Sequence, residues 1–148
     1  MKLYLDVCCW NRPFDDQSQN RVRLEAEAVL SILEMAQSGE IEILGSDIID
    51  DELSGLSDNE RREKVELLLA LTSSQISLTS AIEQCAIKLQ EQNISAFDAL
   101  HLASAERAQV DYFLTTDDDL LHKAKRTELK VKIENPAKWL IQKTSDEN

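Results

Sequence analysis

Lys2-Leu-Tyr-Leu-Asp6 begins the chain with an apolar run that ends abruptly on a carboxylate. A short apolar run of this kind predicts a buried β-strand. Two further runs have the same character, Ile41–Leu44 and Tyr112–Thr115, and Asp117 closely follows the second of them. In open parallel sheets, ligands bind outside the carboxyl ends of the strands. The acidic residues that follow these strands are therefore candidates for a site.

Helical patterns separate the predicted strands. Between Ser18 and Ser38 apolar residues recur every three or four positions, as on one face of a long helix, and Gly39 follows as a stop signal. Short strands that alternate with longer helices require crossover connections. We therefore predict an α/β fold, a three-layer α/β/α sandwich with a mainly parallel sheet. The remaining predicted elements are helices over 48–53, 59–71, 81–92, 95–109 and 117–125, strands over 75–78 and 129–133, a loop over 7–17 and a final turn over 136–140.

Length and composition are those of one globular domain. The chain has 148 residues, of which 43% are hydrophobic and 30% charged, with only three Gly and two Pro. This length suits a single domain with a substantial core. We predict one domain over residues 1–143 and a disordered tail over 144–148. The three cysteines have no regular spacing, and neither a signal peptide nor a membrane-length apolar run is visible, which predicts a cytoplasmic protein without membrane contact.

The charge balance is strongly acidic, with a formal net charge of −12. Such a surface repels polyanions at long range. A nucleic-acid function therefore requires metal ions or a local basic patch to offset the charge. An acidic enzyme of another kind, or a protein-binding module, fits the net charge equally well.

Carboxylates from distant parts of the chain are predicted to meet at one sheet edge. Asp6 and Asp117 follow strands, Asp98 lies in the first turn of a helix, and the acidic run 50–52 lies in the helix after the second strand. Like charges held a few ångströms apart require a cation or bound protons. Oxygen ligands suit Mg²⁺ or Mn²⁺, and such ions activate water and neutralise charge on a phosphate. The pattern favours metal-dependent phosphodiester hydrolysis.

Each of these acidic residues also has a structural interpretation. Asp6 is an ordinary strand-end residue, and Asp98 completes a variant of the capping box with Ser95. Asp117 is of a type that commonly caps helices. Within 50–52, a solvated helix end is the alternative to a site role.

The loop over 7–17 contains residues that suit either packing or RNA contact. Arg12 stands alone among acidic residues, where a guanidinium pairs with a carboxylate or binds a substrate phosphate. Trp10 and Phe14 pin the loop to the domain or stack on an unpaired base. His101, three residues after Asp98, is interpreted as a half-buried structural histidine rather than a catalytic base.

Four stretches resemble PIN-domain proteins, including the toxins of bacterial VapBC-type toxin–antitoxin pairs. The resemblance covers nearly the whole chain and implies a parallel α/β/α sandwich with Mg²⁺- or Mn²⁺-dependent RNA cleavage. The stretches are Leu3-Tyr-Leu-Asp6, Ser46-Asp-Ile-Ile-Asp-Asp-Glu52-Leu53, Asp98-Ala-Leu-His-Leu-Ala-Ser-Ala105 and Phe113-Leu-Thr-Thr-Asp117-Asp-Asp119-Leu120.

The resemblance also assigns expected roles. Asp6, Glu52, Asp98 and Asp117 match the metal-binding acidic positions of the family. Asp119 matches an auxiliary acidic position. Thr115 matches a frequent polar position and joins Arg12 as a candidate for substrate binding.

The sequence departs from the family after its first acidic residue. Many PIN domains have Thr-Asn there, whereas Val7 and Cys8 follow Asp6. We expect Cys8 to be a poor replacement for the polar contact of Asn. The loop Cys9–Asp16 is longer than the common pattern and looks like the signature of a subgroup.

Three functions are compatible with the sequence. The first is an endoribonuclease that acts as the toxin of a toxin–antitoxin pair, with an RNA substrate, an antitoxin partner and a homodimer interface on the helices over 18–38 and 59–71. The second is a non-catalytic PIN-fold module that binds only a protein. The third is a phosphatase with Asp6 as nucleophile, although such enzymes usually carry Asp where Cys8 stands.

Overall fold

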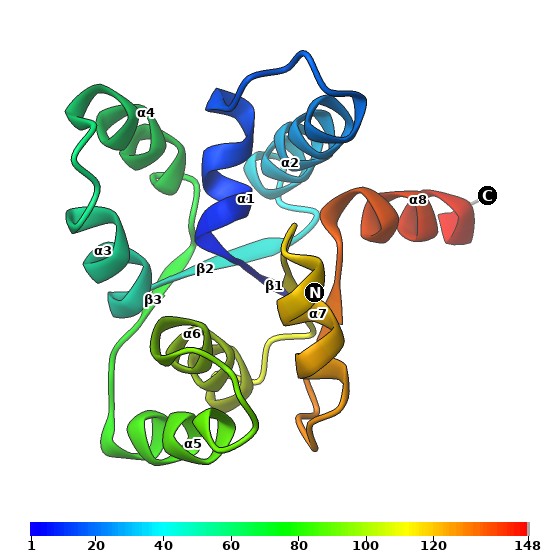
Figure 1. Cartoon of the computed structure of the whole chain (residues 1–148). Coiled ribbons are helices and arrows are strands. Elements are labelled where there is room, and N and C mark those ends of the chain that lie inside the picture. Colours follow the sequence, from blue (N-terminus) through cyan, green and yellow to red (C-terminus); the bar gives the residue numbers. More distant parts are fainter. Residues whose placement is uncertain (148) are drawn as a thin grey trace.

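Strand β1, Lys2–Leu5, lies in the middle of a five-stranded sheet in a computed structural model that describes residues 1–147 (Figure 1). The strand order is β3-β2-β1-β4-β5, and every neighbouring pair is parallel. The predicted parallel α/β architecture is therefore confirmed. The other strands are β2 Glu42–Ser46, β3 Ser74–Ile76, β4 Tyr112–Leu114 and β5 Lys132–Glu134.

Helices cover both faces of the sheet. Helices α1 (Val7–Asn11) and α2 (Asn20–Gln37) lie on one side, and α5 (Ser80–Gln90) and α6 (Ala96–Arg107) lie on the other (Figure 1). A strand buried on both faces is apolar throughout instead of alternating. Accordingly, Leu3, Tyr4 and Leu5 of β1 are all fully buried. The remaining helices are η1 Arg12–Phe14, α3 Asp47–Ser54, α4 Asn59–Leu69, α7 Asp118–Lys125 and α8 Pro136–Glu147.

Side-chain caps begin the helices that carry site candidates. Ser46 accepts a hydrogen bond from the Ile49 amide and starts α3, and Ser95 accepts from the Asp98 amide and starts α6. Asp117 accepts from two amides and starts α7. The caps predicted at Ser95 and Asp117 are confirmed, and they place these polar residues at the ends of strands or loops that face one sheet edge.

The prediction of a loop over 7–17 is wrong for its first half. Asp6 caps α1 through the Val7 amide, and the 3₁₀ helix η1 follows directly. A helix of five residues is too short to show a helical period in sequence. Burial of Val7, Cys9 and Trp10 holds α1 against the sheet.

The C-terminal segment is longer than predicted. The expected turn over 136–140 is the first part of α8, which runs to Glu147. Asn135 caps this helix by accepting from the amides of Ala137 and Lys138, and the buried Trp139 packs edge-on against Tyr112. The predicted tail over 144–148 is thus helical through Glu147, while Asn148 lies outside the described residues.

Within residues 1–147, no helix combines the length and the apolar character needed to cross a bilayer.

Candidate functional site

The candidate site lies where the chain reverses its direction of travel across the sheet. From β1 the order runs outward to β2 and β3, and then returns to β4 on the other side of β1. The amide of Asp6, just past β1, donates to the carbonyl of Leu114 at the end of β4 over 2.9 Å. Such a switch point at the carboxyl ends of parallel strands is the usual ligand position in open α/β sheets.

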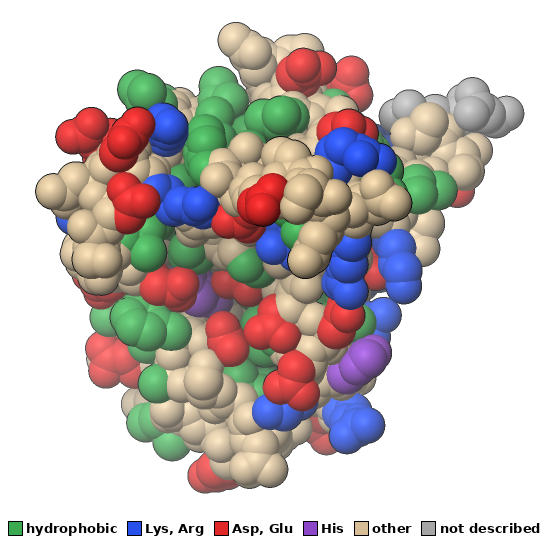
Figure 2. Space-filling view, turned by 45° about the horizontal axis from the view of Figure 1, so that its top comes forward, with side chains coloured by type: hydrophobic (Ala, Val, Ile, Leu, Met, Phe, Trp, Pro, Cys, Tyr) green, Lys and Arg blue, Asp and Glu red, His purple; other side chains and the backbone are tan. Residues whose placement is uncertain are grey.

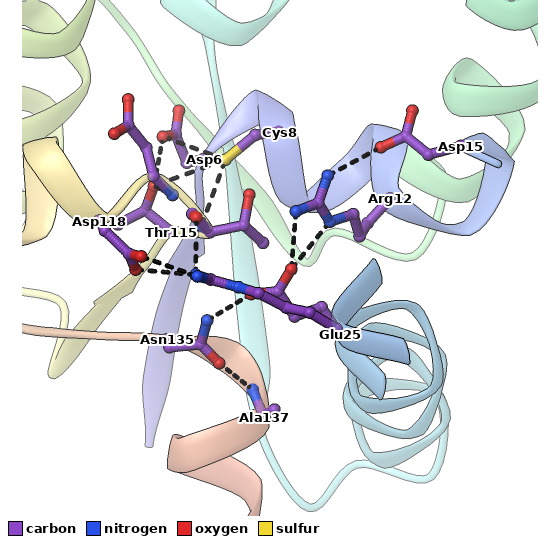
Figure 3. Close-up of polar contacts among 12 residues, drawn as sticks. Asp6, Cys8, Arg12, Asp15, Glu25, Thr115, Asp118, Asn135 and Ala137 are labelled. Carbon is purple, nitrogen blue, oxygen red and sulfur yellow. Dashed lines mark hydrogen bonds and ion pairs between the residues drawn. The ribbon is translucent and has the colours of Figure 1, made fainter. Parts of the chain in front are cut away.

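Asp6 is almost completely buried at this point, with 6% of its surface exposed. Its Oδ1 accepts from the Val7 amide over 2.9 Å, and its Oδ2 accepts from the Thr115 hydroxyl over 2.8 Å (Figure 3). Burial raises the pKa of Asp6 well above its ordinary value, and the neighbouring Cys8 and Asp98 raise it further. In this position, a nearby cation would stabilise the charged form of the carboxylate.

Asp98 connects electrostatically with the other predicted carboxylates. Burial raises its pKa, and Asp117 and Glu52 act in the same direction. Because Asp98 also raises the pKa of Asp6, the other three acidic residues all lie within electrostatic range of Asp98. In the described part of the chain, no three acidic, histidine or cysteine side chains already form a coordination sphere. Figure 2 shows acidic side chains close together in the middle of one face.

Glu52 is held by a buried hydrogen-bond chain. Its Oε1 lies 2.8 Å from Nε2 of His101, which is fully buried. The other ring nitrogen of His101 lies 2.6 Å from the Tyr4 hydroxyl, and that hydroxyl lies 2.7 Å from Oγ of Ser46. The structural interpretation of His101 is consistent with these contacts, although the residue is fully buried rather than half-buried.

Thr115 and Asp117 shape the β4 side of the site. Oγ of Thr115 donates to Asp6 and accepts from the Asp117 amide over 3.1 Å. Oδ1 of Asp117 accepts from the amides of Asp119 and Leu120 as the cap of α7. Asp117 therefore caps α7 and also lies near Asp98.

Asp119 lies at the edge of the cluster. Its carboxylate pairs with Lys123 over 3.0 Å and is largely exposed. Asp119, Asp98 and Lys123 contribute to the wall of a shallow cavity of about 260 Å³. The structure therefore places this auxiliary residue beside Asp98, in a position open to solvent.

Cys8 makes polar contacts with residues of the site. Its sulfur lies 3.4 Å from Oδ2 of Asp6 and 3.4 Å from Oγ of Thr115, and it accepts from the Thr116 amide (Figure 3). A hydrogen bond with Cys9 and contacts with Thr115 and Thr116 lower the pKa of the Cys8 thiol to about 6. Whether Cys8 is a poor replacement for Asn stays a prediction, since these contacts alone do not test it.

Arg12 belongs to a second network, centred on the buried Glu25 of α2. Its Nη2 and Nε lie 2.7 and 3.0 Å from Oε1 of Glu25, and its Nη1 pairs with Asp15 (Figure 3). Arg21 and Asn135 bind the second oxygen of Glu25 over 3.1 and 2.6 Å. These contacts favour the ion-pair interpretation of Arg12, and its contact with substrate stays a prediction.

The aromatic residues Trp10 and Phe14 pack against the core and do not form an exposed surface for RNA. Trp10 is fully buried and its indole nitrogen donates to the Leu5 carbonyl over 3.1 Å, so it pins α1 to the sheet. Phe14 is partly buried against the core. An exposed aromatic residue instead lies at Phe97, directly before Asp98, and nothing in the sequence pattern singled it out.

Comparison with protein families agrees with this geometry. The model of the PIN domain matches residues 3–126. The chain belongs to the PIN-domain family. The family predicted from four short stretches of sequence is therefore confirmed, and the matched range of this PIN domain contains every candidate carboxylate.

Solved structures show the same fold at low sequence identity. VapBC2 from Rickettsia felis, bound to a DNA fragment from its promoter, is 18% identical with a TM-score of 0.65, over 91% of this PIN domain and 98% of that chain. VapBC-1 from nontypeable Haemophilus influenzae is 14% identical with a TM-score of 0.58, over 92% and 98%. VapC20 from Mycobacterium tuberculosis, a Sarcin-Ricin loop cleaving toxin, is 14% identical with a TM-score of 0.56, over 87% and 98%. A comparison with curated proteins gave no significant match.

Proposed function

We propose that this PIN domain is an endoribonuclease that depends on Mg²⁺ or Mn²⁺. The observation that carries the proposal is Asp6, a buried carboxylate at the switch point whose pKa is raised by burial and by neighbouring acids. Membership of a family that consists largely of nucleases supports the same function.

The chemistry of the side chains fits a hard divalent cation. Asp6, Asp98 and Asp117 offer only oxygen ligands, and their mutual repulsion is relieved when a cation lies among them. We assign these three residues to metal binding and Glu52 to metal binding or to orientation of water, with Asp119 as an auxiliary ligand. When bound, the ion supplies an activated water molecule and neutralises charge on the phosphate.

The surrounding residues orient the carboxylates before any ion arrives. The Val7 amide fixes Oδ1 of Asp6 and leaves that oxygen a further lone pair, while the Thr115 hydroxyl and the Cys8 thiol both contact Oδ2. His101 fixes one oxygen of Glu52, and in the described part of the chain no hydrogen bond to the other oxygen is found. Preorganisation of this kind holds a site near its productive geometry.

Single-atom substitutions test the nuclease proposal. We expect Asp6→Asn and Asp98→Asn to abolish Mn²⁺-dependent cleavage of single-stranded RNA and to weaken Mn²⁺ binding in calorimetry, with unchanged circular dichroism. Asp51→Asn is the matched control, because Asp51 directly precedes Glu52 in the acidic run but is exposed to solvent. Cleavage that persists in both site variants would refute the proposal, and a folded wild type that binds no Mn²⁺ would favour a non-catalytic module.

We further propose a toxin role, with an antitoxin partner and a homodimer. The similar structures from Rickettsia felis and Haemophilus influenzae are VapBC proteins, which supports this role. Exposed leucines on the two helices predicted as interfaces also support it: Leu24 and Leu30 on α2 and Leu67 on α4. Light scattering of the wild type and of Leu67→Lys tests the dimer, and co-expression with the product of the neighbouring gene tests the antitoxin.

A further inference from the structure

Phe97 is an exposed aromatic side chain beside the acidic cluster. It is 45% exposed, and within residues 1–147 it is the single aromatic among the large hydrophobic residues with high exposure. It stands in the first turn of α6, immediately before Asp98. The largest aromatic residues elsewhere, such as Trp10 and Phe113, are completely buried. Its exposure is therefore an exception to how this protein uses its aromatic residues.

The Phe97 ring rests on a rigid support. Its centroid lies 6.4 Å from that of His101, with an angle of 30° between the ring planes. His101 is itself fixed by Tyr4 on one ring nitrogen and by Glu52 on the other. A ring that is already oriented loses little conformational freedom when a flat ligand stacks on it.

We propose that Phe97 is a stacking platform for an unpaired base of the RNA strand, next to the phosphate that is cleaved. This inference rests on the proposed ribonuclease function. Proteins that bind single-stranded RNA stack its bases on aromatic side chains. The platform lies at the border of the acidic cluster. Phe97 stacks on His101, which contacts Glu52, and Asp98 lies in the same helical turn as Phe97.

The charge of the protein favours a contact of this kind. The net charge is −12, and the guanidinium groups of Arg12, Arg21 and Arg61 are each already paired with a carboxylate. Stacking supplies affinity without positive charge and depends little on salt. The platform thus provides part of the RNA affinity that phosphate contacts on an acidic surface do not supply.

RNA affinity in a cleavage-deficient background gives the first test. We would measure fluorescence anisotropy of a single-stranded oligoribonucleotide that the wild type cleaves, with Asp6→Asn in Mg²⁺ as the reference. Added Phe97→Ala should weaken binding roughly five- to hundredfold, while Phe97→Trp should preserve it. Phe97→Leu, which keeps apolar surface without a π face, should resemble Phe97→Ala. The slope of log affinity against log salt should not change, because no phosphate contact is lost.

Ile141→Ala on α8 is the matched control, because Ile141 is an exposed apolar residue at 66%. An oligonucleotide that lacks one base beside the cleavage site should lose affinity for the reference protein and not for Phe97→Ala. In Phe97→Trp, RNA should protect the introduced indole from quenching by acrylamide. The native Trp10 and Trp139 are only 0% and 2% exposed, so the quenching signal comes mainly from the introduced indole.

The outcomes separate this inference from the nuclease proposal. If the wild type cleaves RNA, and Phe97→Ala and Ile141→Ala in the reference background bind RNA with equal affinity, the platform alone is overturned. Absence of both cleavage by the wild type and RNA binding by the reference protein would overturn the proposed function and the platform together.

Discussion

The Tyr4 hydroxyl lies 2.6 Å from Nδ1 of His101, and this contact determines how the imidazole meets Glu52. When Tyr4 donates to Nδ1, the imidazole proton resides on Nε2 and is donated to Oε1 of Glu52 over 2.8 Å. Ser46 then donates to the Tyr4 oxygen over 2.7 Å, so Ser46, Tyr4 and His101 each donate one hydrogen bond and accept one. His101 is therefore a positioning residue for Glu52 and has no free lone pair with which to act as a base.

Removal of the Tyr4 hydroxyl should weaken the site without disturbing the strand. In Tyr4→Phe, Nδ1 of His101 loses its donor, and the imidazole no longer has a fixed tautomer. We expect a loss of about 1–2 kcal/mol in unfolding free energy and a loss of about tenfold or more in Mn²⁺ affinity, as for other residues that orient metal ligands. Urea denaturation and calorimetry measure the two effects.

The matched control for this variant is Tyr112→Phe. Tyr112 is partly buried against Trp139, and no hydrogen bond of its hydroxyl is found in the described structure. It should keep wild-type Mn²⁺ affinity. Equal affinities of the two variants would contradict the positioning role of His101.

Neutralisation of the buried acid should stabilise the metal-free protein. Asp6→Asn keeps an oxygen that accepts from the Val7 amide, turns its NH₂ toward the Thr115 hydroxyl, which can accept as well as donate, and removes a buried charge that repels Asp98. We expect the melting temperature in EDTA at pH 7 to rise by a few degrees, on the order of the change that about 1 kcal/mol causes in a domain of this size. Saturating Mn²⁺ should raise the melting temperature of the wild type and not of the variant. Calorimetric melting in both buffers provides the measurement, and a lower melting temperature in EDTA would count against the electrostatic account.

The stability of the metal-free protein should depend on pH with a defined sign. Because the pKa values of Asp6 and Asp98 are raised in the folded state, the folded protein binds more protons than the unfolded chain above the ordinary carboxylate range. These two groups therefore make the unfolding free energy fall as pH rises from about 4 through their raised pKa values. Asp47 and Asp118 act oppositely, since hydrogen bonds lower their pKa values.

The difference between the wild type and the double variant Asp6→Asn/Asp98→Asn isolates this effect, because the other carboxylates are common to both proteins. Urea denaturation between pH 4 and 8 in EDTA should show the double variant gaining stability relative to the wild type as pH increases. If the difference in unfolding free energy between the two proteins stays constant across this pH range, the linkage argument is contradicted.

The second network should be important for stability. Glu25 is 2% exposed and binds Arg12, Arg21 and Asn135, so it joins the segment after α1 to α2 and to the start of α8. Glu25→Ala should cost about 3 kcal/mol, because two guanidinium groups and an amide lose a buried partner. Glu27→Ala, which is exposed and forms only a long ion pair with Arg23, should cost less than about 0.5 kcal/mol. Equal losses in urea denaturation would show that the network contributes little.

The fold was predictable because its signals are long or repeated. Apolar strands, an extended helical period over α2 and capping residues such as Ser95 identify the elements and their order. The short helix α1 was missed because five residues contain little more than one turn. The length of α8 was missed because Trp139 stabilises it through contacts with residues far away in the sequence.

The candidate site was predictable in its acidic residues and not in their supports. Asp6 and Asp117 are visible because they follow strands. The chain from Tyr4 to His101 and the burial of Glu25 depend on contacts between distant elements, which no local pattern encodes. The one signal for Glu25 is an acid that lies among the apolar positions of a helix.

The central place of β1 has a consequence for synthesis of the protein. Its neighbour β4 lies near the end of the chain, and the bond between Asp6 and Thr115 joins residues separated by 109 positions. A growing polypeptide on the ribosome has no β4 strand and no Asp117 until most of its length has been translated. The acidic cluster of the proposed nuclease therefore stays incomplete until most of the chain has been translated.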